Sequence, residues 1–246
     1  MLYLERPVII IPANRNTQPL CESVSRTRFK SNQVNKIYIF SGLGVDKRVF
    51  DKIDFGNLNP KFVDWIEPKK NESIENYCKR IYQEIKEENP ILVGLSFGGI
   101  VAVEISKIIK TQNVILIASA KTKTELPLLY RIAGSLRITK LIPASILKQQ
   151  NFLTNWFFGV NSNEDKILLG KILEDTNNKF LKWAINEIAN WKNTSEPMNF
   201  IHIHGNNDKI IPIKNVKVNI TIENGGHFMT VNKAKEIEHI IKNAIT

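Results

Sequence analysis

One stretch, Ile91–Gly99, constrains the fold of this chain more than any other. Its first half is a short run of branched apolar residues, which is typical of a buried strand. The chain then turns through Ser96, and the apolar spacing over Ile100–Lys110 predicts a helix. A serine on so tight a turn adopts strained backbone angles, so Gly94 and Gly98 leave room where a Cβ would strike the adjoining strand or helix. The sequence therefore predicts a strand, a sharp turn and a helix around one serine.

The pattern Gly94-x-Ser96-x-Gly98 resembles the nucleophile elbow of the α/β-hydrolase family. Such a pattern occurs by chance in ordinary glycine turns, but here a strand pattern precedes it and a helix pattern follows. The resemblance implies an α/β fold with a mainly parallel central sheet flanked by helices, and it implies that Ser96 is a nucleophile. A nucleophilic serine needs a base, an acid that orients the base, and an oxyanion hole.

Candidates for the acid and the base follow two late strand patterns. Phe200–His204 is followed by a glycine-containing loop with Asp208. Val216–Ile222, which reads as the last strand, is followed by Asn224–Phe228, where His227 comes directly after two glycines. The resemblance assigns Asp208 as the acid and His227 as the base, in the chain order Ser, Asp, His that the family has. Glu125, which follows an earlier strand pattern, is the alternative acid.

The oxyanion hole has two candidate backbone donors. Lys36–Phe40 is typical of a buried strand, and Ser41-Gly42-Leu43 follows it where members of the family carry an oxyanion loop, often with histidine at the position of Ser41. The resemblance assigns the Leu43 N–H as one donor. The Phe97 N–H, at the start of the helix after the serine, is the second. A plain glycine turn is the alternative for the first loop.

The alternation of strands and helices stops between residues 121 and 198, where only helical patterns are found. In the family, a segment at this place commonly forms a helical cap over the active site. We therefore expect a cap over 121–198 and a core made of 35–120 and 199–246. Large aromatic residues of the cap are candidates for lining an apolar substrate pocket, although packing of the cap onto the core is the alternative for each. These candidates are Phe152, Trp156, Phe157 and Trp183.

Residues 1–34 carry the weakest pattern and are expected to form a loosely ordered extension. Val8–Ile11 could form one edge strand, but this run is too short for a secretory signal. No apolar run approaches the ~20 residues that span a bilayer. The two cysteines, Cys21 and Cys78, provide no disulfide framework, so a cytoplasmic location is expected.

The formal net charge of +10 raises the question of a nucleic-acid or membrane-surface partner. The lysines are dispersed without a dense basic block, which favours a solvated surface and excludes an obvious nucleic-acid site. His202 and His204 share one face of a strand, but no third ligand follows at a convincing spacing. We therefore expect neither a metal ion nor a cofactor.

These features together predict a serine hydrolase that cleaves a carboxylic ester or thioester of a small, largely apolar substrate through an acyl-enzyme. Acyl transfer and cleavage of a C–C bond are alternatives on the same fold. A ligand-binding or signalling module with a slow or vestigial triad is an alternative from another class, since fold does not fix function. The sequence leaves the substrate and the oligomeric state open.

Overall fold

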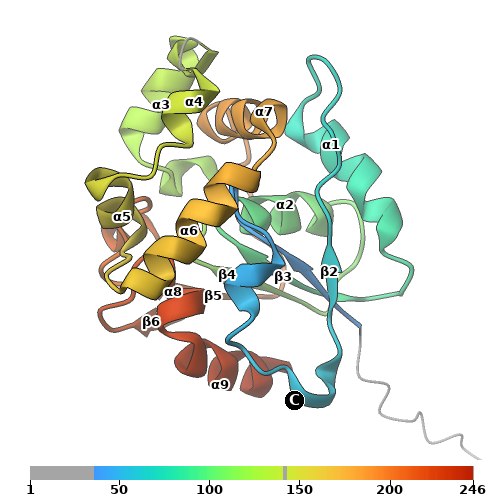
Figure 1. The fold of residues 1–246 in the computed structure, drawn as a ribbon. Coiled ribbons are helices and arrows are strands. Elements are labelled where there is room, and N and C mark those ends of the chain that lie inside the picture. Colours follow the sequence, from blue (N-terminus) through green and yellow to red (C-terminus); the bar gives the residue numbers. More distant parts are fainter. Residues whose placement is uncertain (1–35, 141–142, 246) are drawn as a thin grey trace, which may run out of the picture. The chain divides into compact units, whose positions relative to one another are not determined.

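The computed structural model describes residues 36–140 and 143–245, which fall in one compact unit. The extension expected over residues 1–34, with its edge strand, lies outside these residues. A six-stranded sheet forms the centre, in the order β2-β1-β3-β4-β5-β6, and every neighbouring pair is parallel (Figure 1). The strands are β1 (Ile37–Phe40), β2 (Lys61–Val63), β3 (Ile91–Leu95), β4 (Asn113–Ile117), β5 (Phe200–Gly205) and β6 (Ile220–Ile222). The predicted parallel α/β architecture is confirmed.

The central strands are buried on both faces, which is why they read as continuous apolar runs. In β1, Ile37 and Ile39 belong to one hydrophobic cluster and Tyr38 and Phe40 to the other, because successive side chains point to opposite faces. Strands β3 and β4 divide in the same way. The sheet therefore separates two cores, and each core needs its own layer of helices.

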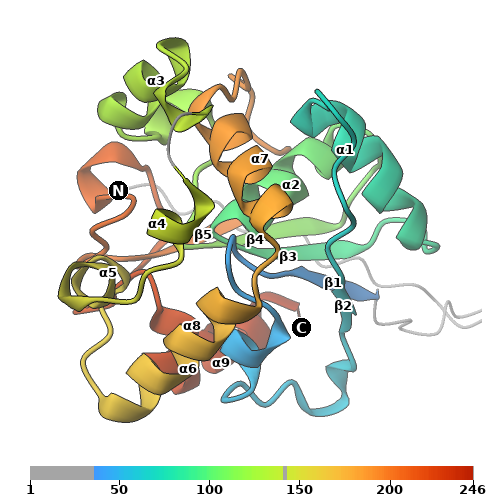
Figure 2. The ribbon, with the colours of Figure 1, turned by 45° about the horizontal axis from the view of Figure 1, so that its top comes forward.

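Helices supply both layers (Figures 1 and 2). Side chains of α1 and α2 fill one core, and side chains of α6 and α9 contribute to the other. The helices are α1 (Ile74–Ile81), α2 (Phe97–Ser106), α3 (Leu128–Ser135), α4 (Ala144–Leu147), α5 (Phe152–Phe158), α6 (Asn163–Asp175), α7 (Asn178–Ala189), α8 (Met229–Asn232) and α9 (Ala234–Ile245). Short 3₁₀ turns cover Lys47–Phe50, Gly56–Leu58, Tyr82–Glu84, Lys123–Glu125, Ile138–Lys140 and Ile213–Asn215.

The segment expected to form the cap carries α3 to α7 and, in its described parts 121–140 and 143–198, no strand. It is not a separate body, because Leu169 of α6 and Phe180 of α7 are buried in the two cores of the sheet. Within the segment, Asn151 begins α5 by accepting a hydrogen bond of 2.9 Å from the Thr154 N–H. Because Asn151 caps the N-terminus of α5 in this way, the aromatic residues of α5 lie on a helix that is separate from α4.

Candidate active site

Ser96 lies on the turn between β3 and α2 with φ 52° and ψ −118°, a strained conformation for a residue with a Cβ. A Cβ on Gly94 would lie 2.4 Å from the Gly98 carbonyl oxygen, and one on Gly98 would lie 2.2 Å from the Phe40 carbonyl oxygen. The two glycines thus allow the helix to pack directly on β3 and β1. The buried Ser119 hydroxyl donates to the Ser96 carbonyl at 2.7 Å and holds the turn from β4.

The structure brings Ser96, His227 and Asp208 together although 131 residues separate the first two in sequence. His227 Nδ1 lies 2.8 Å from Asp208 Oδ2, and His227 Nε2 lies 2.8 Å from Ser96 Oγ. A carboxylate can only accept, so the imidazole proton is assigned to Nδ1. His227 Nε2 is then an acceptor, and the Ser96 hydroxyl donates to it. This relay has the geometry that a nucleophilic serine requires.

Asp208 is held as an ionised carboxylate. Burial alone would raise its pKa, but the attraction of His227 and the hydrogen bond from its ring outweigh burial, so the pKa lies below its ordinary value. The backbone N–H groups of Ile210 and Ile211 donate to Asp208 Oδ1 at 2.8 and 2.9 Å. The acid loop therefore fixes one oxygen with backbone donors and presents the other to His227.

His204 packs beside this loop. Its Nε2 lies 2.8 Å from the Ile211 carbonyl oxygen, which can only accept, so Nε2 carries the proton. Burial lowers the pKa of His204, which keeps the ring neutral. The described residues contain no group of three or more His, Cys, Asp or Glu side chains that could hold a metal ion.

Glu125, the alternative acid, makes other contacts. Its carboxylate lies 2.6 Å from the buried Lys121 Nζ and accepts from the Lys121 N–H at 2.7 Å and the Lys217 N–H at 3.2 Å. The pair fixes the start of the segment after β4 against Lys217, in the loop before β6. Because this carboxylate is committed to Lys121, the structure favours Asp208 as the acid.

We expect Glu125→Gln to lower stability and to leave the specific activity of the folded protein unchanged. The substitution leaves the Lys121 ammonium buried without its counter-charge, which costs about 3–5 kcal/mol of unfolding free energy. Urea unfolding monitored by tryptophan fluorescence measures the loss. Glu196→Gln is the matched control, because Glu196 is half-exposed and lies 3.8 Å from the same ammonium, so it should cost less than about 1 kcal/mol. Equal losses of unfolding free energy in the two variants would show that Glu125 is not the main counter-charge of Lys121.

His202 provides a prediction on pH. Burial, with smaller contributions from His204 and Lys121, lowers its pKa to about 3. The unfolded chain protonates this imidazole below about pH 6.5 and the folded chain does not, so stability falls by about 1.4 kcal/mol per pH unit as the pH decreases from 6.5. Urea unfolding at pH 7 and pH 5 should therefore show a loss that is smaller by about 2 kcal/mol in His202→Gln. His239→Gln, at an exposed position of α9, should retain the wild-type loss. An unchanged loss in His202→Gln would refute the prediction.

The two candidate oxyanion donors flank Ser96. A Cβ on Gly42 would lie 3.4 Å from Ser96 Cβ, so the loop after β1 runs directly against the serine. Leu43 lines the same cavity as Ser96. Phe97 is the first residue of α2, where helix geometry leaves its N–H without an acceptor inside the helix.

Ser96 and His227 open onto a cavity of about 460 Å³. Most of its lining side chains are aliphatic or aromatic. They come from the loop after β1, the loop after β5, α2 and helices α3 to α7. Among the described residues, no Asp, Glu, Lys or Arg side chain lines it. A cavity of this size and character binds an apolar group of a small molecule.

Comparison with solved structures identifies the fold. An esterase from Exiguobacterium antarcticum superimposes with a TM-score of 0.64 at 15% identity, over 86% of this chain and 91% of that chain. A thermophilic esterase gives a TM-score of 0.62 at 15% identity, over 87% and 90% of the two chains. MenH from S. aureus gives 0.60 at 13% identity, over 87% and 94%. The chain has the α/β-hydrolase fold. No protein-family profile and no curated protein sequence matches it.

Three of the four predicted pocket residues lie elsewhere in this α/β-hydrolase fold, which corrects the prediction. Phe157 lines the cavity. Phe152 is 84% exposed, and Trp156 lies on the outer side of α5, with Lys209 Nζ 5.8 Å from its ring centre. Trp183 donates its indole N–H to the Glu72 carbonyl at 2.7 Å and packs against Tyr77, so it joins α7 to the core. The rotation of α5 and α7 about their axes decided these positions, and the aromatic residues on several sides of α5 do not reveal it.

Two residues that the pocket prediction missed have direct roles in the site. The Phe158 ring meets the His227 ring edge-on at 5.9 Å, and the Phe158 carbonyl accepts from the Phe228 N–H at 3.0 Å. Tyr130 of α3 donates its hydroxyl to the Ile210 carbonyl at 3.0 Å, next to the acid. Both also line the cavity. Helices α3 and α5 thus support the loops that carry Asp208 and His227.

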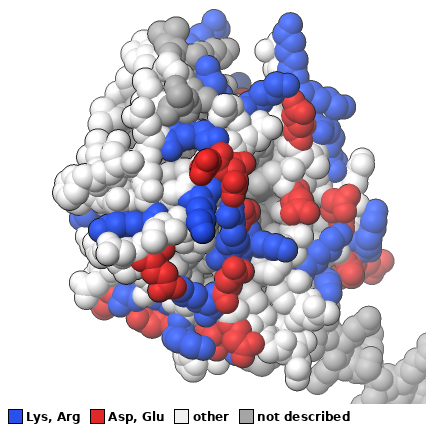
Figure 3. Space-filling model, viewed as in Figure 1, with Lys and Arg blue, Asp and Glu red and all other residues white. Residues whose placement is uncertain are grey.

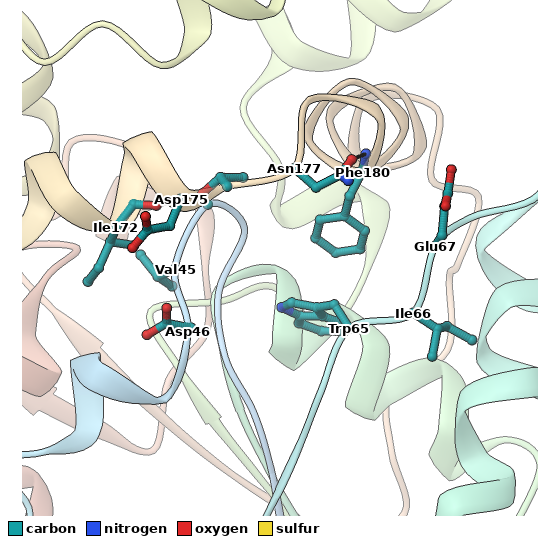
Figure 4. Close-up of a pocket in the computed structure, with 11 residues that line it drawn as sticks. Val45, Asp46, Trp65, Ile66, Glu67, Ile172, Asp175, Asn177 and Phe180 are labelled. Atoms are coloured by element: carbon teal, nitrogen blue, oxygen red, sulfur yellow. Dashed lines mark hydrogen bonds between the residues drawn. The ribbon is translucent and has the colours of Figure 1, made fainter.

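A second cavity, of about 350 Å³, shares Gly44 with the first. Figure 4 shows the residues that line this second cavity. Trp65 and Phe180 stack there with ring centres 5.3 Å apart. Its carboxylates are already paired, since Arg48 lies 2.7 Å from both Asp46 and Asp175, and Lys179 Nζ lies 2.9 Å from Glu67. Neither Ser96 nor His227 lines this cavity, whereas both line the first one.

Proposed function

We propose that this chain is a serine hydrolase that cleaves a carboxylic ester or thioester with a small, largely apolar acyl group. The observation that supports this most is the relay of two 2.8 Å hydrogen bonds from Ser96 through His227 to Asp208, at the wall of an apolar cavity. The esterases among the structures that share the fold support the same class of reaction.

The reaction follows from this geometry. His227 Nε2 takes the proton of Ser96 as Oγ attacks the carbonyl carbon, and the carbonyl electron pair moves to the oxygen. Asp208 stabilises the imidazolium that forms. The N–H groups of Leu43 and Phe97 bind the tetrahedral oxyanion. Collapse expels the alcohol or thiol, which takes the proton from His227, and a water molecule activated in the same way releases the acid.

The cavity lining determines the preferred acyl group. Its aliphatic and aromatic side chains gain about 0.8 kcal/mol for each methylene removed from water. A buried carboxylate or ammonium group would find no partner among the described lining residues and would lose its hydration. The substrate is therefore neutral in the part that enters the cavity.

A series of p-nitrophenyl esters of graded acyl length tests the proposal. We expect kcat/KM to rise roughly three- to fourfold per methylene until the cavity is full. The p-nitrophenyl half-ester of succinate should be hydrolysed much more slowly than the butyrate ester, because it places a carboxylate in the cavity. A fluorophosphonate probe should label Ser96.

The same assay separates the alternatives. Product formed only when an added alcohol or thiol replaces water as acceptor would indicate acyl transfer. Folded protein that neither reacts with the probe nor hydrolyses any ester would refute the proposal. Saturable ligand binding that survives Ser96→Ala, without turnover by the wild type, would then indicate a binding module.

A further inference from the structure

The outer side of the cap carries an unusual concentration of exposed apolar side chains. Among the described residues, nine of the twelve large apolar side chains that are exposed fall between residues 128 and 156. We call these nine the cap face. They are Leu128, Leu129, Ile132, Leu136, Ile138, Ile146, Phe152, Leu153 and Trp156. Figures 1 and 2 place α3, α4 and α5, which carry most of them, next to one another along one side of the sheet.

Helices α3 and α5 carry large apolar side chains on both sides. Tyr130 and Ala133 of α3 line the cavity, whereas Leu129 is 75% exposed. Phe157 of α5 lines the cavity, whereas Phe152 is 84% exposed. A surface helix of a protein in water normally has a polar outer side. Helices that are apolar all round are found where both sides leave water, and exposed apolar patches of this kind mark interaction surfaces.

The charges of this segment point to the partner. No Asp or Glu occurs between Glu125 and Glu164, although the chain contains 24 acidic residues, and the same interval carries Arg131, Arg137, Lys140 and Lys148. The surface shows the same lack of acidic residues: in Figure 3 the upper left, over α3 and α5, is almost free of acidic side chains. The dispersed lysines of the whole chain conceal this local absence of acids.

Positively charged side chains also lie at the border of the cap face. Arg137 is exposed at the end of α3, and Lys209 Nζ lies 5.8 Å from the ring centre of Trp156. Tryptophan beside lysine or arginine is the arrangement found at the level of lipid headgroups, where the ring reaches the apolar boundary and the cation contacts phosphate. A second copy of this chain would bring two equally basic faces together, which disfavours self-association.

We infer that the cap face docks on a lipid–water interface that carries anionic headgroups. Apolar side chains of α3 and α5 enter the boundary between headgroups and acyl chains, and the surrounding cations attract the headgroups. The cavity lies on the inner side of the same helices, so docking places it close to a source of apolar molecules. Docking does not require the proposed hydrolysis. No helix among the described residues is long and apolar enough to cross a membrane.

Co-sedimentation of the full chain with vesicles tests the inference. We expect binding to vesicles of phosphatidylglycerol and phosphatidylcholine in equal parts, weaker binding to pure phosphatidylcholine, and a decrease with added salt. Leu129→Ser combined with Leu153→Ser should lower the partition coefficient roughly tenfold. Arg137→Gln should lower it about fivefold. Neither leucine lines the cavity, so hydrolysis of soluble p-nitrophenyl acetate should remain as a check of folding.

Matched controls lie away from the cap face. Met198→Ser removes an apolar side chain that is 97% exposed and should leave binding unchanged. Met198 precedes β5, at the N-terminal end of the parallel strands, whereas Ser96 follows β3 at their C-terminal end. Lys235→Gln removes an exposed cation of α9 and serves as the charge control. Ser96→Ala should bind vesicles as the wild type does, so a failure of the proposed hydrolysis and a failure of docking are distinguishable.

Three results would overturn the inference. The first is the absence of vesicle binding by the wild type, and the second is wild-type binding by the double leucine variant. The third is a wild-type dimer in light scattering that the leucine substitutions convert to a monomer, which would assign the cap face to a second copy of the chain.

Discussion

Ser96→Ala is expected to reduce ester hydrolysis by a factor on the order of 10⁴ or more. The substitution removes the hydroxyl oxygen that hydrogen-bonds to His227 and would form the acyl bond, and it leaves the cavity and the candidate oxyanion donors in place. It removes one oxygen from a half-buried side chain, so the fold should remain intact. Initial rates with the best p-nitrophenyl ester, at enzyme concentrations high enough to detect the residual rate, measure the loss.

Ser106→Ala provides a serine control on the same helix. The Ser106 hydroxyl donates to the Val103 carbonyl at 2.7 Å at the far end of α2. Its loss should leave kcat/KM within about a factor of two, because it touches neither the cavity nor the relay. Retention of hydrolysis by Ser96→Ala, with the probe still reacting at another residue, would show that Ser96 is not the nucleophile.

Asp208→Asn is expected to lower kcat by roughly 10³- to 10⁴-fold. The asparagine oxygen can still accept from the Ile210 and Ile211 N–H groups, and its amide then donates to His227 Nδ1. This hydrogen bond places the imidazole proton on Nε2, which faces Ser96 as a donor and cannot take its proton. The fold should be retained, because the backbone hydrogen bonds of the acid loop are preserved.

Asp165→Asn is the control for loss of a buried carboxylate. Asp165 is 5% exposed and lies 3.1 Å from Lys52 Nζ, at the start of α6. This variant should lose some stability and keep its kcat. A melting temperature and a kcat for both variants therefore separate the two roles. If Asp208→Asn lost no more activity than Asp165→Asn, Asp208 would have no role in orienting His227.

Most of the fold could be predicted because the strands are buried on both faces. Ile91–Leu95 and Asn113–Ile117 lie between two helical layers, so nearly all their residues are apolar and the sequence shows them as continuous apolar runs. The last strand was harder. The pattern Val216–Ile222 predicted a longer strand than the Ile220–Ile222 that pairs, because the Asn219 side chain accepts the His202 N–H at 2.8 Å where a backbone carbonyl would be needed to extend the ladder.

The site was predictable where a residue type and its local backbone coincide. Ser96 is flanked by glycines because atoms of α2 and β1 occupy the Cβ positions. His227 follows Gly225 and Gly226 for a related reason, since a Cβ on Gly226 would lie 3.0 Å from Gly159 of the cap. Where two backbones approach closely, only glycine fits, so such positions can be recognised in the sequence.

The sequence by itself determined the parallel sheet, the strained turn at Ser96 and the chain order of Ser96, Asp208 and His227. Tertiary structure decided between the two candidate carboxylates, since Asp208 lies 2.8 Å from His227 whereas Glu125 is paired with Lys121. It also decided which side of α5 faces the cavity. The physical reason is that the hydrophobic pattern of a helix identifies its buried side only when the other side is polar, and α3 and α5 carry large apolar residues on both sides.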